Sequence, residues 1–271
     1  MKLVNILLDA VDAAKTLVLD NMDKQTLKTG GQNAYGDHTL LLDAQAEDEI
    51  IRVLHESGVA FSILTEERGM VPCEGEPDYL VVVDPVDGSS NLERNIPLVT
   101  AGISAIPFKP TMTTDDIEVS VIESFFTKER YIAVQGQGVT RNGRPVSPAL
   151  PVDIGDAIIS YDTNRSWFDG FGDGSHRALE ALHDIRRTAS NLLDLCWTAS
   201  GSLDGMADLR GILPIVHISG THMVFEAGGF VIEESGDRLH LPIGPDVRMS
   251  FVAASNEALA RQVLAAFKGH S

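Results

Sequence analysis

Apolar residues recur along the chain with helical spacing in several places. Near the N-terminus they return every three or four positions, at Leu3, Leu7, Ala10, Ala14 and Leu17, as on the buried face of a helix. We expect this first helix to be scaffold. Similar spacing predicts further helices over residues 44–55, 178–185, 190–200, 219–227 and 257–267. A loop rich in glycine and aspartate is expected at residues 169–174.

Short runs of apolar and β-branched residues predict strands between these helices. They cover residues 61–65, 79–83, 99–107, 119–124, 131–134, 157–161, 206–210, 230–233 and 250–254. The dipeptide Asn142-Gly143 predicts a tight hairpin turn. A proline-containing break at residues 147–151 predicts an N-terminal half of residues 1–147 and a C-terminal half of residues 148–271.

The strand predicted over residues 79–83 ends in the segment Asp84-Pro85-Val86-Asp87-Gly88-Ser89-Ser90. Its unbroken apolar run is typical of a strand buried on both faces. Asp84 and Asp87 leave its end three residues apart and can point at one hard cation. Gly88-Ser89-Ser90 offers N–H and hydroxyl groups to an anion if a helix begins there. A cation beside an anion is the basis of metal-assisted phosphate chemistry, whereas an acidic turn without function is the alternative.

Other carboxylates follow neighbouring elements. Glu66-Glu67 comes directly after the strand predicted over residues 61–65, one strand before the acidic segment. Such a pair is otherwise typical of a solvated surface. Residues 28–38 are rich in glycine and polar residues, as in a mobile loop. Asp43 lies where this region meets the helix of residues 44–55, so it is either a helix N-cap or a functional carboxylate.

The charge of the chain narrows the kinds of partner. The 271 residues include 39 acidic and 21 basic side chains, for a net charge of −18 and a pI of about 4.7. So acidic a protein is a poor match for nucleic acid. It accommodates an anionic substrate only where metal ions invert the local field. A solubility or salt adaptation is the alternative explanation of the charge.

Cysteine usage and the N-terminus indicate the compartment. Cys73 and Cys196 are the two cysteines of the sequence, and they form no metal-ligand spacing. We therefore expect reduced thiols and a cytoplasmic protein. The first predicted helix contains Asp9 and Asp12, so no signal peptide is expected. No apolar run approaches the length of a membrane span.

Four separated motifs of the chain match the pattern of one family. They are Gly36-Asp37-His38-Thr39 with Asp43, Glu66-Glu67, the segment Asp84-Pro85-Val86-Asp87-Gly88-Ser89-Ser90, and Glu226-Ala227-Gly228-Gly229. The sequence therefore resembles the inositol monophosphatase / fructose-1,6-bisphosphatase superfamily, and most of all its archaeal branch. The resemblance covers nearly the whole chain, since residues 136–143 and 189–204 fit as well.

The resemblance implies an α/β fold, a layered αβαβα sandwich of the sugar phosphatase type, with the site between the two halves and usually a homodimer. It implies an Mg²⁺-dependent, or alternatively Mn²⁺-dependent, hydrolysis of inositol or sugar phosphates. The implied metal ligands are Glu66, Asp84, the carbonyl of Val86, and Asp87. The implied phosphate ligands are Gly88, Ser89 and Ser90. Together with Glu66, Asp43 and Ser89 would orient and deprotonate the attacking water.

A second signature of the family is altered here. Family members carry Trp-Asp-x-Ala-Ala-Gly shortly before Glu-Ala-Gly-Gly, and the Asp is a shared metal ligand. Counting back from Glu226 without a gap places Val216 at that position, and valine cannot coordinate a cation. A shift of one residue places His217 there instead. Imidazole is a poor ligand for Mg²⁺ but a fair one for Mn²⁺ or Zn²⁺, and a lone histidine is often structural.

Two hypotheses about function follow from this departure. In the first, the protein is a working metal-dependent phosphatase with an altered second metal site. In the second, it is a catalytically impaired member of the family that binds a phosphorylated sugar or inositol as a regulatory or binding protein. The clustered carboxylates favour the enzyme, because their mutual repulsion needs a cation. The loss of a shared ligand favours the binding protein.

Overall fold

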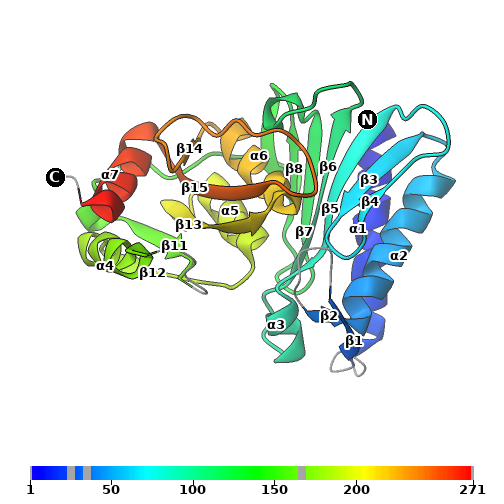
Figure 1. Ribbon diagram of the computed structural model, residues 1–271, viewed down its shortest axis with the longest axis horizontal. Coiled ribbons are helices and arrows are strands. Elements are labelled where there is room, and N and C mark those ends of the chain that lie inside the picture. The colour runs from blue at the N-terminus through cyan, green and yellow to red at the C-terminus, as the bar shows by residue number, and fades with distance from the viewer. Residues whose placement is uncertain (1, 23–27, 33–37, 164–168, 270–271) are drawn as a thin grey trace.

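The computed structural model describes residues 2–22, 28–32, 38–163 and 169–269. Its helices and strands form five alternating layers of helix and sheet (Figure 1). The predicted α/β sandwich is therefore confirmed. In the described residues the helices are α1 Lys2–Asp20, α2 Leu41–Glu56, α3 Ser89–Glu93, α4 Phe171–Ala181, α5 Asn191–Ala199, α6 Ile218–Glu226 and α7 Glu257–Lys268.

Eight strands form the larger sheet, in the order β10-β9-β8-β7-β6-β5-β3-β4. Their bounds are β3 Phe61–Thr65, β4 Gly69–Val71, β5 Tyr79–Asp87, β6 Thr100–Pro107, β7 Val119–Ser124, β8 Arg130–Val134, β9 Gly138–Arg141 and β10 Arg144–Val146. The smaller sheet has the order β12-β11-β13-β15-β14. Its strands are β11 Ile158–Tyr161, β12 Asp184–Ile185, β13 Gly205–Pro214, β14 Phe230–Glu233 and β15 Arg248–Ala254.

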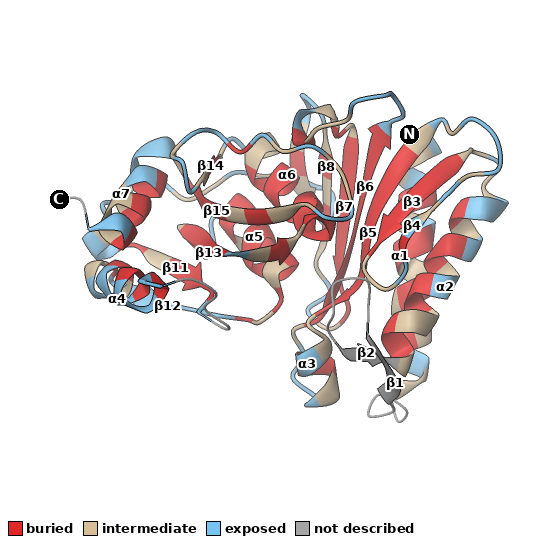
Figure 2. Cartoon of the chain, in the orientation of Figure 1, coloured by how far each residue is buried: buried red, intermediate tan, exposed pale blue. Residues whose placement is uncertain are grey.

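Helices cover both faces of each sheet. α1 and α2 lie on the outer face of the larger sheet, α5 and α6 lie between the two sheets, and α4 and α7 cover the outer face of the smaller one (Figure 1). The alternation of side chains along β5 shows why. Val81 and Val83 pack with α1 and α2, whereas Leu80 and Val82 pack with α5 and α6. β5 is buried along its length (Figure 2). Each of its fully buried aliphatic side chains contributes roughly 1.5–3 kcal/mol to the stability of the fold, so both helix layers hold the strand in place.

The two loop predictions, for residues 28–38 and 169–174, are both wrong in part. Residues 28–38 contain β1 Lys28–Gln32 and the start of β2 His38–Leu40, which pair with each other, while residues 33–37 lie outside the described residues. α4 begins inside the predicted loop of residues 169–174. Gly174, which favoured the loop, lies within the helix. A glycine is needed there because a Cβ would come within 2.7 Å of the Phe267 ring.

The helix predicted over residues 178–185 is also shorter than expected. α4 ends at Ala181, and residues 184–185 instead form β12, which pairs in parallel with β11. The hairpin at Asn142-Gly143 is confirmed, since both residues have positive φ, 50° and 75°, and they join the antiparallel strands β9 and β10.

The break at residues 147–151 lies between strands of different sheets. β10 ends at Val146 in the larger sheet, and β11 begins at Ile158 in the smaller one. The division into residues 1–147 and 148–271 as separate domains stays a prediction. Among the described helices, none is both long and apolar enough to cross a bilayer.

Candidate metal and phosphate site

The acidic motifs meet at one edge of the larger sheet. β3 and β5 run in parallel, with Thr65 paired to Val83. Because parallel strands run toward the same edge, Glu66, which follows β3, and Asp84, which follows Val83 within β5, are neighbours there. Glu66 lies in the turn between β3 and β4 and is half-buried, whereas Asp84 is fully buried.

A β-bulge turns Asp84 and Asp87 toward the same side. Residues three apart in a regular strand point to opposite faces. Here the pairing with β6 shifts register, because Asp84 lies opposite Gly102 and Asp87 opposite Thr100. Three steps on β5 therefore match two on β6, and the extra residue brings the two carboxylates onto one side. The sequence predicted a strand over residues 79–83, but the structure extends β5 through residues 84–87.

One oxygen of Asp87 is fixed by the second half of the chain. Oδ2 accepts hydrogen bonds from the Leu192 amide at 2.6 Å and the Ser190 hydroxyl at 2.7 Å, and from the Thr100 hydroxyl at 3.3 Å. Three donors on Oδ2 leave Oδ1 to face the rest of the acidic cluster. Sequence reasoning missed Ser190 and Thr100, because no local pattern shows that the start of α5 reaches the end of β5.

His217 brings an imidazole to this carboxylate pair. It ends the short 3₁₀ turn Ile215–His217 that precedes α6, and its Nε2 lies 3.2 Å from Asp84 Oδ2 and 3.7 Å from Asp87 Oδ1. Nδ1 lies 3.2 Å from the carbonyl oxygen of Pro214. One ligand atom each from Asp84, Asp87 and His217 can be chosen so that all lie within 4.8 Å of one another.

Val216, the residue at the family position in the ungapped count, belongs to the core instead. Its side chain is fully buried in the apolar cluster between the two sheets. In the structure it is therefore the shifted register, with His217, that reaches the acidic pair. The role of His217 as a ligand stays a prediction.

Burial and mutual repulsion govern the charges at the site. Burial, followed by the neighbouring Glu66 and Asp87, raises the pKa of Asp84 well above its ordinary value. Burial also raises the pKa of Glu66 to about 7, although the charge of His217 acts in the opposite direction. Burial by itself would lower the pKa of His217, but the hydrogen bond and charge of Asp87 outweigh it and the pKa is raised. A cation would relieve this repulsion.

The donor atoms fit a divalent cation. Asp84 Oδ2 is buried and accepts no hydrogen bond within the described part of the chain. Carboxylate oxygens and the Val86 carbonyl are the ligands that Mg²⁺ prefers. That carbonyl already accepts a hydrogen bond from the Ser89 hydroxyl at 3.0 Å, and its second lone pair is available to a metal.

The predicted phosphate-binding residues begin a short helix. Gly88 precedes α3 with a φ of 102°, and a Cβ there would lie 2.8 Å from the Leu98 carbonyl oxygen. Only glycine fits this position. Ser89 is partly exposed and Ser90 is exposed, and the Ser89 hydroxyl is held at the Val86 carbonyl, between the two aspartates in the chain.

Asp43 lies inside the first turn of α2 and is buried. Because the helix begins at Leu41, the N-cap interpretation of Asp43 is wrong. One helical turn later, the buried Glu47 accepts hydrogen bonds from the Thr65 hydroxyl at 2.6 Å and the Glu67 amide at 3.0 Å. Glu47 thereby joins α2 to the turn that carries Glu66. The i, i+4 spacing of two carboxylates on the apolar face of α2 was the signal that could have identified it.

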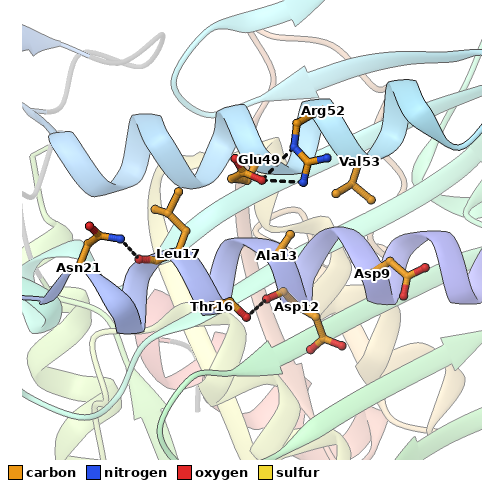
Figure 3. Close-up of a pocket in the computed structure, with 9 residues that line it drawn as sticks. All are labelled: Asp9, Asp12, Ala13, Thr16, Leu17, Asn21, Glu49, Arg52 and Val53. Atoms are coloured by element: carbon orange, nitrogen blue, oxygen red, sulfur yellow. Dashed lines mark hydrogen bonds and ion pairs between the residues drawn. The ribbon is translucent and has the colours of Figure 1, made fainter.

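Gly36-Asp37 falls outside the described residues. A groove of about 580 Å³ lies between α1 and α2 (Figure 3). Its lining residues are Asp9, Asp12, Ala13, Thr16, Leu17, Asn21, Glu49, Arg52 and Val53, none of which belongs to the predicted site.

Known proteins similar to this chain share one family. The model of the inositol monophosphatase family matches residues 2–271. The fructose-1,6-bisphosphatase/inositol-1-monophosphatase of Methanothermobacter thermautotrophicus is 32% identical over 241 residues, covering 85% of this chain and 84% of that protein. The Nus factor SuhB of Escherichia coli K12 is 27% identical over 267 residues, covering 97% and 94%.

A solved structure shares the fold. The crystal structure of an inositol monophosphatase–fructose 1,6-bisphosphatase superposes with a TM-score of 0.84 at 24% identity, covering 98% of this chain and all of that one. Members of the family generally use divalent metals, which agrees with the acidic group found here. The chain belongs to the inositol monophosphatase family.

Proposed function

We propose that this protein is a Mg²⁺-dependent phosphomonoesterase that hydrolyses inositol phosphate or sugar phosphates, with Mn²⁺ as a possible substitute. The observation that carries the proposal is the buried convergence of Asp84 and Asp87 with the half-buried Glu66 at the end of β3 and β5. Clustered carboxylates of this kind are stable when a cation neutralises them.

The residues divide the chemistry among them. Glu66, Asp84, Asp87 and the Val86 carbonyl would hold the metal. Divalent cations bound there would lower the pKa of a water molecule and neutralise charge on the leaving oxygen. The start of α3, at Gly88, Ser89 and Ser90, would bind the phosphate through N–H groups and hydroxyls.

The attacking water would be oriented by protein groups. Asp43, buried in the first turn of α2, would accept its proton, with Ser89 and Glu66 helping to orient it. The Ser89 hydroxyl donates to the Val86 carbonyl, so it is held at the junction of metal and phosphate. Phosphoryl transfer to water needs positioning and charge stabilisation from the protein rather than covalent chemistry.

A second candidate is a phosphate-ester-binding protein without turnover. The ungapped family count that ends on Val216 favours it, and a relative bears the name of a Nus factor rather than an enzyme. Under either candidate we expect a cytoplasmic protein that forms a homodimer. Sedimentation equilibrium would test the dimer.

Phosphate release distinguishes the two candidates. We expect inorganic phosphate from inositol-1-phosphate or fructose-1,6-bisphosphate on titration with Mg²⁺ or Mn²⁺. Asp84→Asn should reduce the rate by about a thousandfold or more, since metal stabilisation is worth several kcal/mol. The exposed Asp246→Asn is the matched control. Release no greater than that of Asp84→Asn, with ester binding retained, would establish the binding protein instead.

A further inference from the structure

In the count shifted by one residue, an imidazole stands at the position that the family gives to an aspartate. His217 is buried, with only 6% of its surface exposed, and its Nε2 lies 3.2 Å from Asp84 Oδ2. The same nitrogen lies 3.7 Å from Asp87 Oδ1. Two carboxylate oxygens and one ring nitrogen therefore surround one point.

The backbone sets which ring nitrogen faces that point. A carbonyl oxygen only accepts hydrogen bonds, so the contact between Nδ1 and the Pro214 carbonyl at 3.2 Å places a hydrogen on Nδ1. In the neutral ring, Nε2 then carries a lone pair directed at Asp84 and Asp87. Hydrogen bonding of the far nitrogen to a backbone carbonyl is the usual way in which proteins orient a metal-binding histidine.

The carboxylate side of the point is also prepared for a ligand. Asp84 Oδ2 is buried without a hydrogen bond in the described residues. Asp87 has its other oxygen held by the Ser190 hydroxyl and the Leu192 amide. These contacts fix Oδ1 on the side of His217. The two carboxylates thus come from β5 and the imidazole from the 3₁₀ turn Ile215–His217.

We propose that Asp84, Asp87 and His217 form a cation position that selects a transition metal such as Mn²⁺, Co²⁺ or Zn²⁺ over Mg²⁺. Imidazole nitrogen suits these borderline ions, whereas Mg²⁺ prefers oxygen ligands throughout. Glu66, Asp84 and the Val86 carbonyl retain an all-oxygen set for Mg²⁺. The site would hold two different metals that share Asp84. This inference rests on the proposed function for its metal dependence, but its test does not require turnover.

The test measures Mn²⁺ binding to the chelator-treated full-length chain in the presence of excess Mg²⁺. We expect one Mn²⁺ to bind, with ¹⁴N modulation in its pulsed electron paramagnetic resonance spectrum. His217→Asp should abolish the ¹⁴N signal and lower the preference for Mn²⁺ over Mg²⁺, because an oxygen ligand replaces the nitrogen. His176→Asp removes an exposed histidine and should change neither reading.

The outcomes separate this inference from the proposed function. Mn²⁺ bound with ¹⁴N coupling but without phosphate release supports the metal position and contradicts the enzyme. Phosphate release with no ¹⁴N coupling, or a Mn²⁺ preference unchanged in folded His217→Asp, contradicts the metal position and leaves the enzyme intact. Circular dichroism of His217→Asp verifies that it is folded.

Discussion

The two sides of the site differ in what fixes them. On the side of the larger sheet, Glu66, Asp84 and Asp87 are set by the parallel pairing of β3 with β5 and by one bulge against β6. On the other side, the 3₁₀ turn Ile215–His217 presents one residue to the acidic pair and buries its neighbour. Strand pairing tolerates little change of register. In the 3₁₀ turn, by contrast, moving one residue along the chain goes from a core side chain, Val216, to one that faces the carboxylates, His217.

This difference explains why the sheet side keeps the family motif and the other side does not. A strand that slips by one residue turns its whole apolar set outward, so Asp84 and Asp87 are tied to the packing of β5. The side chain at the end of the 3₁₀ turn belongs to no strand and contacts the Pro214 carbonyl and the two carboxylates. The 3₁₀ turn is thus the part of the candidate site where the side chain facing the carboxylates can change without altering the fold.

The largest expected effect distinguishes the two residues of the turn. Val216→Asp would bury an unpaired carboxylate in the core between the sheets, and should cost about 5 kcal/mol of unfolding free energy. His217→Asp should lower stability far less in the presence of Mg²⁺, because its carboxylate would meet a cation. Urea denaturation of both variants compares them. Equal stabilities would show that Val216 and His217 have been assigned to the wrong sides of the turn.

A second prediction concerns Asp194, a buried carboxylate on the other side of the site, which we expect to be kept neutral by a proton where Asp84 would be neutralised by a cation. Asp194, in the first turn of α5, accepts a hydrogen bond from Ser160 at 2.6 Å, while its Oδ1 has no hydrogen-bond partner within the described residues. Burial raises its pKa from 3.8 to about 7. The native state therefore holds a proton that the unfolded state releases above pH 3.8.

The contribution of the Asp194 proton to the free energy of unfolding is full below about pH 4 and is lost as the pH rises through about 7. The difference between these pKa values corresponds to roughly 4 kcal/mol. Asp194→Asn should remove this pH dependence, as measured by urea denaturation in chelator between pH 4 and 8. A pH profile identical to that of the unmodified protein would show that Asp194 is ionised in the fold, as a cation ligand would be.

The smallest effect concerns the contact that joins the two sides. Ser190→Ala removes one donor from Asp87 Oδ2 but leaves the Leu192 amide in place. A hydrogen bond to a charged group is worth about 1.5–3 kcal/mol, so metal affinity should fall roughly 10- to 100-fold. Ser190→Thr should restore part of it, and the exposed Ser202→Ala should have no effect. Unchanged Mn²⁺ affinity in Ser190→Ala would show that the Ser190 hydroxyl does not position Asp87 for the metal.

Much of the sheet side could be predicted because its chemistry follows the chain. The apolar run of residues 79–83 predicted a buried strand, and Asp84 and Asp87 come directly after that run in the sequence. The links between distant segments could not be predicted. Glu47 reaches the Glu66 turn, and Ser190 reaches Asp87, through packing that no local pattern encodes. Gly174 misled because it serves close packing on Phe267 rather than a loop.

The register at the 3₁₀ turn was also beyond the sequence. Counting back from Glu226 treats every residue as equivalent, but burial separates Val216, which is fully buried in apolar surroundings, from His217, which touches carboxylates. By the ungapped count alone, Val216→Asp would restore the family motif. The structure makes it a core defect instead.

A crystal structure of the chain soaked in Mn²⁺, with anomalous data collected for the metal, tests the role of His217 most directly. We predict an anomalous peak between Asp84, Asp87 and His217, with the His217 ring still hydrogen-bonded to the Pro214 carbonyl. Mn²⁺ bound at Glu66 and Asp84 alone, with His217 Nε2 still in contact with Asp84 and no metal between them, would contradict it.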